Sequence, residues 1–267
     1  MRELERDLPT NSATAPEAAR QVLAIVGAGR LGSSIATAAD AAGLTVRLAG
    51  RRNAAEACEG ADAVLLCVPD EAIAEAAAAI AGAGVAVGFA GHTSGASTLA
   101  ELKPLGEAGS ALFSIHPLQT VPDGDSDLTA CPAAIAGSDG AALGFARELA
   151  KRLGMRPFAV DDDDRAAYHA AAAIASNFLV ALQESAVELL ERTGVEDARE
   201  LLAPLVLRTA ANWSERGAGA LTGPIARGDE ATVERHLEAL REAAPELTDL
   251  YEVLAERTRV HAAREQR

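Results

Sequence analysis

Positions 27–32 carry residues whose types and spacing could bind the phosphates of a dinucleotide. They follow the apolar run Val22–Val26 directly and begin a stretch with helical periodicity. In a GxGxxG turn, Gly27 permits the tight turn, Gly29 lets a pyrophosphate approach the backbone, and Gly32 allows close packing of helix on strand. Free N–H groups at the helix start attract anions. Unless this is an incidental glycine-rich turn, the cofactor-binding residues are Gly27, Ala28, Gly29, Arg30, Leu31 and Gly32.

The tip of the second expected strand decides between NAD and NADP. An acidic residue there would bind the ribose 2′-hydroxyl, whereas arginine accommodates a 2′-phosphate. Here Gly50 is followed by Arg51 and Arg52, with no carboxylate in place. The sequence therefore predicts NADP(H), the alternative being two solvated surface charges. At the end of the third expected strand, Val68 and Pro69 would line the nicotinamide side, unless Pro69 only ends the strand.

Two histidines follow expected strands at the edge of the sheet where ligands bind. His116 and Gln119 belong to the sequence His-Pro-Leu-Gln-Thr, and His92 and Ser94 follow an earlier strand. We expect all four on loops beside the nicotinamide. Reduction of a carbonyl needs a proton donor and polar groups that hold the substrate. We assign the proton donor to His116 and substrate contacts to the other three residues, with structural roles as the alternative.

The second half of the chain offers further polar candidates on helices. His169 and Asn177 are eight residues apart on one long expected helix, roughly 80° apart around its axis, so both could face one cleft. Asn177 lies among apolar residues, where a buried amide needs a partner from the protein or from a ligand. His169 is a second candidate for the acid, although a lone histidine on an alanine-rich face often only packs. No lysine follows Lys151, so this half has no ammonium acid.

The segment 221–229 is rich in glycine and proline and joins two expected helices. Thr222 could contact substrate, and Arg227 could bind a substrate carboxylate with two parallel hydrogen bonds. Asp229 could instead give the segment a structural role by capping the next helix. Asp229 and His236 share a helix face, but two residues do not make a metal site, so we predict no metal.

These residues must be positioned by alternating strands and helices. The periodicity predicts an α/β fold: an N-terminal Rossmann domain with a doubly wound, mostly parallel sheet, followed by an all-helical C-terminal domain. We expect a loose tail over residues 1–19, the NADP-binding domain over 20–160 and the helical substrate and dimerisation domain over 161–267. Strands are expected at Val22–Val26, Thr45–Ala49, Ala63–Val68, Val85–Phe89, Leu112–Ile115, Ala133–Ala136 and Arg156–Val160. Helices are expected at Leu31–Ala42, Glu71–Ala81, Ala141–Leu153, from about 161 to 192, and at Ala198–Asn212, Glu230–Ala243 and Glu246–Ala263.

Composition narrows the partners and the compartment. The 267 residues are 49% hydrophobic and carry a net charge of −15, which argues against nucleic acid and anionic membrane surfaces as partners. A small-molecule substrate fits better. Three cysteines without metal-ligand spacing predict a disulfide-free cytoplasmic protein. We also expect no membrane span, because no stretch approaches 18 strongly apolar residues, and no signal peptide.

Several of these segments together resemble a known bacterial family. They are the glycine-rich turn, the sequence from His116 to Thr120, Tyr168-His169 with Ser176-Asn177, and Leu221 to Asp229 followed by His236-Leu237. The family consists of Rossmann-like oxidoreductases whose C-terminal part is a domain of unknown function, DUF2520. It is similar to 6-phosphogluconate dehydrogenase, ketopantoate reductase, pyrroline-5-carboxylate reductase and F420-dependent NADP oxidoreductase. The resemblance implies a homodimer with substrate held between the domains, and a small 2-keto acid such as ketopantoate as substrate. The sequence departs from ketopantoate reductase in lacking the lysine of the helical domain.

Three hypotheses follow for the function. The first is an NADPH-dependent reductase of a small 2-keto acid, in which His116 or His169 is the acid, Asn177 orients the substrate and Arg227 anchors its carboxylate. The second is a related NADP oxidoreductase that acts on an imine or on the deazaflavin F420. The third is a regulatory protein that binds NADP(H) without turnover, which the missing lysine favours.

Overall fold

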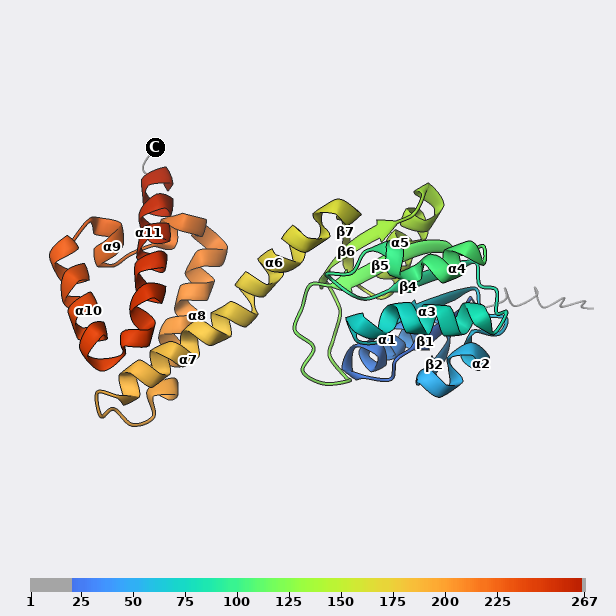
Figure 1. Ribbon diagram of the computed structural model, residues 1–267, viewed down its shortest axis with the longest axis horizontal. Coiled ribbons are helices and arrows are strands. Elements are labelled where there is room, and N and C mark those ends of the chain that lie inside the picture. The colour runs from blue at the N-terminus through green and yellow to red at the C-terminus, as the bar shows by residue number, and fades with distance from the viewer. Residues whose placement is uncertain (1–20, 266–267) are drawn as a thin grey trace, which may run out of the picture. The chain divides into compact units, whose positions relative to one another are not determined.

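Seven short apolar segments form one sheet in the order β2-β1-β3-β4-β5-β6-β7. The computed structural model describes residues 21–265 (Figure 1). The strands are β1 Val22–Val26, β2 Thr45–Ala49, β3 Ala63–Leu66, β4 Phe89–His92, β5 Ala111–Pro117, β6 Pro132–Gly137 and β7 Arg156–Ala159. Neighbours pair in parallel except β5 and β6, which are antiparallel. This confirms the doubly wound, mostly parallel sheet.

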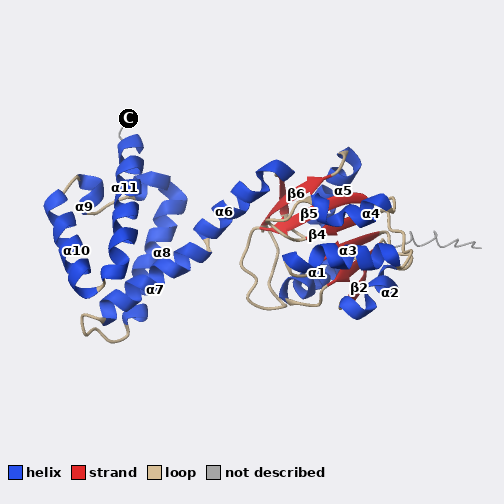
Figure 2. Cartoon of the chain, in the orientation of Figure 1, coloured by secondary structure: helices blue, strands red, loops and turns tan. Residues whose placement is uncertain are grey.

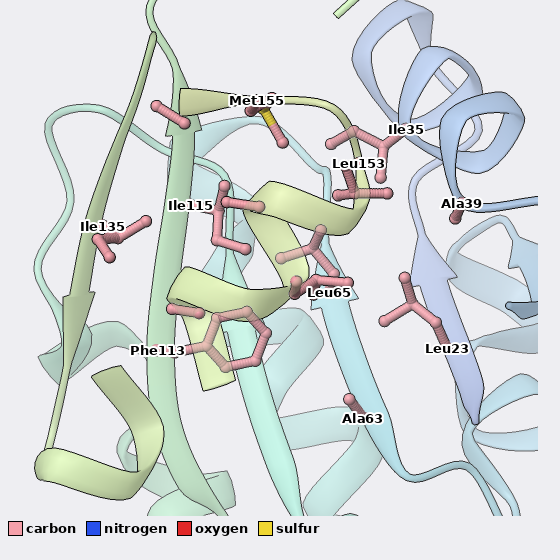
Figure 3. Close-up of a cluster of buried hydrophobic side chains, with 14 of the residues drawn as sticks. Leu23, Ile35, Ala39, Ala63, Leu65, Phe113, Ile115, Ile135, Leu153 and Met155 are labelled. Carbon is pink, nitrogen blue, oxygen red and sulfur yellow. The ribbon is translucent and has the colours of Figure 1, made fainter. Parts of the chain in front are cut away.

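Helices cover both faces of the sheet because successive strand residues point to opposite sides (Figure 2). On one face, Leu23 and Ile25 belong to a core with α1 (Arg30–Ala41) and α5 (Gly140–Arg152), part of which Figure 3 shows. On the other, Ala24 and Val26 pack with three further helices. These are α2 (Ala54–Cys58), α3 (Ile73–Gly82) and α4 (Lys103–Glu107). The periodicity did not predict α2 and α4, which are only five residues long.

The fourth strand lies further along the chain than expected. Val85–Phe89 was predicted, whereas β4 covers Phe89–His92 and pairs Gly91 with Phe113 on β5. A Cβ atom at Gly91 would lie 2.5 Å from the Phe113 ring, so only glycine fits beneath that side chain. The register therefore depends on a partner 22 residues away, which local periodicity cannot detect.

Contacts divide the chain into one unit that ends at Ala172 and a second that begins at Ala173. Arg165, the first residue of α6 (Arg165–Ala175), is 1% exposed, so the start of this helix belongs to the core of the first unit. The backbone of Ser176 leaves helical geometry, with φ −119° and ψ −74°, and separates α6 from α7 (Asn177–Glu191). The single long helix expected from about 161 to 192 was therefore wrong.

The second unit is all-helical, as expected. After α7 it contains α8 (Ala198–Arg216), α9 (Pro224–Arg227), α10 (Glu230–Ala243) and α11 (Thr248–Glu265). Asp229 caps α10, since its carboxylate accepts a hydrogen bond from the backbone N–H of Thr232 at 3.1 Å. This confirms the structural role expected for Asp229.

Large apolar side chains of the second unit lie exposed on α7 and α8. Phe178 is 57% exposed on α7, and Leu201 and Leu205 on α8 are 61% and 63% exposed. We call these three residues the apolar face. Val180, Leu207 and Trp213 are exposed as well, but Val180 and Leu207 lie two positions from Phe178 and Leu205 and so point to the other side of their helices. The segment Asp162–Glu191 is also long and apolar enough to cross a membrane by length and composition alone. The expectation that no such stretch exists was wrong, because alanines extend its apolar character.

Candidate cofactor and substrate site

The turn between β1 and α1 has the geometry that a dinucleotide fingerprint requires. Gly27 has a φ of +117°, and a Cβ atom there would lie 2.3 Å from the carbonyl oxygen of Cys67. A Cβ atom at Gly32 would lie 1.8 Å from the carbonyl oxygen of Gly27. By contrast, a Cβ atom at Gly29 would have no described heavy atom within 4 Å. Two glycines thus allow backbone segments to pack closely, and the third leaves open space at the start of α1.

A cavity of about 540 Å³ lies beside this turn. The strand order reverses at β1, with β2 on one side and β3 on the other, and ligands of doubly wound sheets bind at such a point. The cavity is lined by the turn after β1, the end of β3, the loop after β4, the end of β5 and the first part of α6. Its residues are Gly29, Arg30, Leu31, Cys67, Val68, Pro69, Asp70, Thr93, Ser94, Gly95, His116, Pro117, Gln119, Val121 and His169.

Nine residues that the sequence singled out therefore meet in one cavity: Gly29, Arg30, Leu31, Val68, Pro69, Ser94, His116, Gln119 and His169. Arg51 and Arg52 lie outside it, in the exposed 3-10 turn η1 (Arg51–Asn53) that follows β2 directly. Their side chains are at the carboxyl edge of the strand beside β1. Arg51 also approaches Glu75, with 3.9 Å between the charged atoms.

His116 belongs to the sheet itself, although a loop position was expected. It is the sixth residue of β5, and its Nδ1 atom lies 2.7 Å from the hydroxyl of Tyr168 on α6. Burial, together with the neighbouring His169 and Arg165, lowers the pKa of His116 to about 4. The imidazole is therefore neutral at pH 7. Tyr168 is one of the polar donors that the sequence offers in this part of the chain and belongs to the Tyr168-His169 segment, but its pairing with His116 was not expected.

His92 does not line the cavity, so its expected contact with substrate was wrong. It is the last residue of β4 and is fully buried, because β4 extends three residues further than predicted. Its Nε2 atom lies 3.2 Å from the carbonyl oxygen of Thr98, and its Nδ1 accepts a hydrogen bond from the backbone N–H of Ser94. Burial lowers its pKa to about 4. His92 thus shapes the loop that carries Ser94 and Gly95.

A buried arginine fastens α6 to the wall of the cavity. Arg165 donates hydrogen bonds to the carbonyl oxygen of Ser94 at 3.0 Å and to the hydroxyl of Ser114. Its Nε atom lies 3.5 Å from a carboxylate oxygen of Asp162 in η4 (Asp162–Asp164). The other oxygen of Asp162 accepts a hydrogen bond from the backbone N–H of Leu99. This ion pair was not expected from the sequence.

Cys67 contributes a thiol to the wall of the cavity. Burial raises its pKa to about 12, so the thiolate that a nucleophile or a metal ligand requires is not present at neutral pH. All three cysteines are free. Within residues 21–265, no three side chains of the His, Cys, Asp or Glu type gather in a way that would hold a metal ion.

Three expected site residues belong to the second unit. Asn177 is the first residue of α7 and is exposed in the single chain, whereas the sequence indicated a buried position in mid-helix. Thr222 precedes α9 and Arg227 is its last residue, and both are exposed. In the same unit, Nδ1 of His236 lies 2.8 Å from the hydroxyl of Tyr251. This contact repeats the pairing of His116 with Tyr168.

Comparison with protein families identifies one domain. Residues 131–258 match the model of the domain of unknown function DUF2520, so the chain carries this domain and the expected resemblance is confirmed. The match begins before β6, well inside the first unit, and is therefore not restricted to the helical part at 161–267 as expected. No curated protein matches the chain.

Solved structures show the same fold over nearly the whole chain. Protein TM1727 from Thermotoga maritima is 24% identical, with a TM-score of 0.75, and the match covers 92% of this chain and 100% of that one. BF3122 from Bacteroides fragilis, provisionally named an NADP oxidoreductase, is also 24% identical, with a TM-score of 0.69 and coverage of 90% and 98%. An imine reductase from Streptomyces aurantiacus is 16% identical, with a TM-score of 0.65 and coverage of 92% and 100%.

Proposed function

We propose that this protein is an NADP(H)-dependent oxidoreductase that reduces a small 2-keto acid, with ketopantoate as the first compound to test. The observation that carries the proposal is that one cavity joins the glycine-rich turn to His116 and His169. Structures of the same fold support it, since they include a provisional NADP oxidoreductase and an imine reductase.

Each part of the first unit has a role in this proposal. The turn at 27–32 holds the pyrophosphate at the start of α1, and Arg51 and Arg52 bind the 2′-phosphate. Val68 and Pro69 lie beside the nicotinamide, which would supply a hydride when NADPH is bound. His116 or His169 donates the proton, while Ser94 and Gln119 contact the substrate. In the second unit, Thr222 contacts the substrate, Arg227 binds its carboxylate and Asn177 orients it.

One observation favours an imine as the second candidate substrate. Among the residues that line the described cavity, Arg30 of the cofactor turn is the one cation, and Asp70 adds a carboxylate. A protonated imine is positively charged and suits such a wall, whereas a keto acid needs an anchor such as Arg227. A panel of cyclic imines therefore belongs beside the keto acids, together with F420.

Cofactor choice gives the first quantitative prediction. We expect the purified protein to bind NADPH more tightly than NADH, because two guanidinium groups contact the 2′-phosphate. Replacing both Arg51 and Arg52 with alanine should weaken NADPH binding by at least roughly 10- to 100-fold, the equivalent of a single charge-assisted contact, and leave NADH binding unchanged. Fluorescence titration measures the affinities for NADPH and NADH. Arg152→Ala, which removes an exposed arginine of α5, is the control. Equal affinity for the two cofactors would refute the assignment to NADP.

Turnover separates the three hypotheses for function. NADPH oxidation is followed at 340 nm with 2-keto acids including ketopantoate, with imines and with F420. Turnover of a keto acid that Asn177→Ala lowers supports the first hypothesis, and turnover of an imine or F420 instead supports the second. Tight NADPH binding without turnover on any of these substrates would favour the third hypothesis, a cofactor-binding regulator.

The apolar face supports a homodimer. We also place the protein in the cytoplasm, where the environment is reducing. Exposed patches of this kind are rare on monomeric proteins, and a second copy that packs on α7 and α8 would cover them. We expect light scattering to give twice the chain mass of 27.3 kDa. Leu205→Glu places a charge in this face and should give the monomer mass, whereas Arg208→Ala on the same helix should not. A monomer at micromolar concentration for the unaltered chain would contradict the proposal.

A further inference from the structure

The contact between His116 and Tyr168 bears on how the site donates a proton, an inference that rests on the proposed reductase function. A neutral imidazole has one nitrogen that donates a hydrogen bond and one that accepts. Nδ1 of His116 lies 2.7 Å from the Tyr168 hydroxyl, so the direction of this one bond decides which ring nitrogen carries the proton. The rings meet nearly edge to face, at 85°, and the hydroxyl lies at the nitrogen rather than over the ring.

The opposite edge of the His116 ring faces the cavity wall. A Cβ atom at Gly95 would lie 2.8 Å from Nε2 of His116 and 2.7 Å from Nδ1 of His169. Gly95, His116 and His169 all line the cavity. Because Gly95 has no side chain, no Cβ atom presses against either nitrogen. A group bound in the cavity therefore meets Nε2, while Nδ1 is occupied by Tyr168.

Neighbouring charges favour the tyrosine as donor. Arg165 lies one helical turn before Tyr168 on α6, and its positive charge stabilises negative charge on the phenol oxygen. The groups that face His116 are Arg165, His169, Asp70 and His92. Burial nevertheless raises the pKa of Tyr168, so that its hydroxyl keeps its proton at pH 7. A hydroxyl that donates to Nδ1 leaves the proton of the ring on Nε2.

We propose that Tyr168 holds His116 with its proton on Nε2 and passes its own proton to Nδ1 when His116 protonates the substrate. As negative charge develops on the substrate oxygen or nitrogen, the Nε2–H bond breaks and its proton goes to that atom. Nδ1 simultaneously takes the Tyr168 proton, so the imidazole stays neutral and the negative charge rests on the phenolate beside Arg165. Water then returns one proton to the pair. Tyr168 thus acts through His116 and is a positioning residue.

The relay explains how a histidine that is neutral at pH 7 can act as an acid. Without Tyr168, donation from Nε2 would leave an imidazolate anion in a partly buried site, which is costly. With Tyr168, the negative charge forms on an oxygen next to a guanidinium group. His169 is exposed and has no such partner among the described residues, so His116 is the proton donor of the two.

The test is Tyr168→Phe, which keeps the ring and removes the hydroxyl. Two-bond ¹H–¹⁵N spectra of protein labelled in its five histidine rings report which nitrogen carries the proton, and His116→Gln assigns the signal. We expect a proton on Nε2 in the unaltered protein and a mixture of both forms in Tyr168→Phe. Tyr251→Phe is the matched control, since it removes the same contact from His236 and should leave His116 unchanged. A proton on Nδ1 in the unaltered protein, or an unchanged ring in Tyr168→Phe, would overturn the proposal.

Turnover provides the second measurement. Removal of a proton donor costs typically 10²- to 10⁴-fold in rate, so Tyr168→Phe should lower kcat by roughly 10²-fold while NADPH affinity stays the same. A loss smaller than twofold would also overturn the relay. The spectra need no substrate, so they still test the relay if the unaltered protein turns over nothing and the proposed function itself fails.

Discussion

Replacing Arg165 with alanine should lower the free energy of unfolding by about 3–5 kcal/mol, because Asp162 would lose its partner. The side chain is 1% exposed, and its donors reach Ser94 and Ser114 on two separate segments. In the unaltered protein Oδ1 of Asp162 and Nε of Arg165 are both buried without a hydrogen-bond partner among the described residues, and they lie 3.5 Å apart. The substitution removes the positive charge beside that carboxylate oxygen. Urea unfolding measured by circular dichroism gives the difference.

Two controls separate the buried charge from the general loss of an arginine. Arg152→Ala removes an exposed guanidinium from α5 and should change the unfolding free energy by less than about 0.5 kcal/mol. Arg165→Met removes the same guanidinium group. Adding Asp162→Asn to it should recover part of the lost unfolding free energy, since the unpaired carboxylate charge is then gone. If Arg165→Ala is as mild as Arg152→Ala, the buried pair contributes little to stability.

Gly32→Ala should destabilise the first unit by about 3 kcal/mol, the upper end of the usual cost of overpacking. Its Cβ atom would lie 1.8 Å from the carbonyl oxygen of Gly27, and backbone atoms cannot move aside as a flexible side chain can. The loss should be present without any cofactor, because the clash is between two parts of the chain. Thermal unfolding of the cofactor-free protein measures it.

Gly29→Ala is the matched variant that tests the ligand rather than the fold. The added methyl group meets no described atom within 4 Å, so we expect the melting temperature to stay within a degree or two. It would enter the space assigned to the pyrophosphate and should weaken NADPH binding roughly tenfold or more. If Gly29→Ala binds NADPH as the unaltered protein does, the pyrophosphate does not lie against this turn.

The parts of the fold that local sequence determines were predicted well. β1 and β2 begin and end at the expected residues, and the turn after β1 needs glycine at Gly27 for its backbone alone. The start of β4 was missed because it depends on how Gly91 fits beneath Phe113. The antiparallel direction of β6 has no local signal either, since a buried strand has the same apolar composition in both directions.

The candidate site also contains residues that local sequence reveals and residues that it does not. The glycines and the residues after β3 were found from motifs, whereas Arg165 and the pairing of Tyr168 with His116 were not. The partners of Arg165 lie 51 and 71 residues away, and Tyr168 meets His116 across 52 residues. Such pairs exist only once the sheet and α6 are packed. His92 was misplaced because a three-residue shift of β4 moved it from a loop into the core.

The DUF2520 match begins at residue 131, between two strands that lie side by side in one sheet. A boundary there separates β5 from β6, which are joined by a ladder of five residue pairs. A fragment cut at this point keeps β6 and β7 as a two-stranded ribbon with both edges unpaired and without the facing strands of its core. Ribbons of this kind are marginally stable and prone to edge-to-edge aggregation. The segment that the domain model matches is thus smaller than the unit of packing to which its first strands belong.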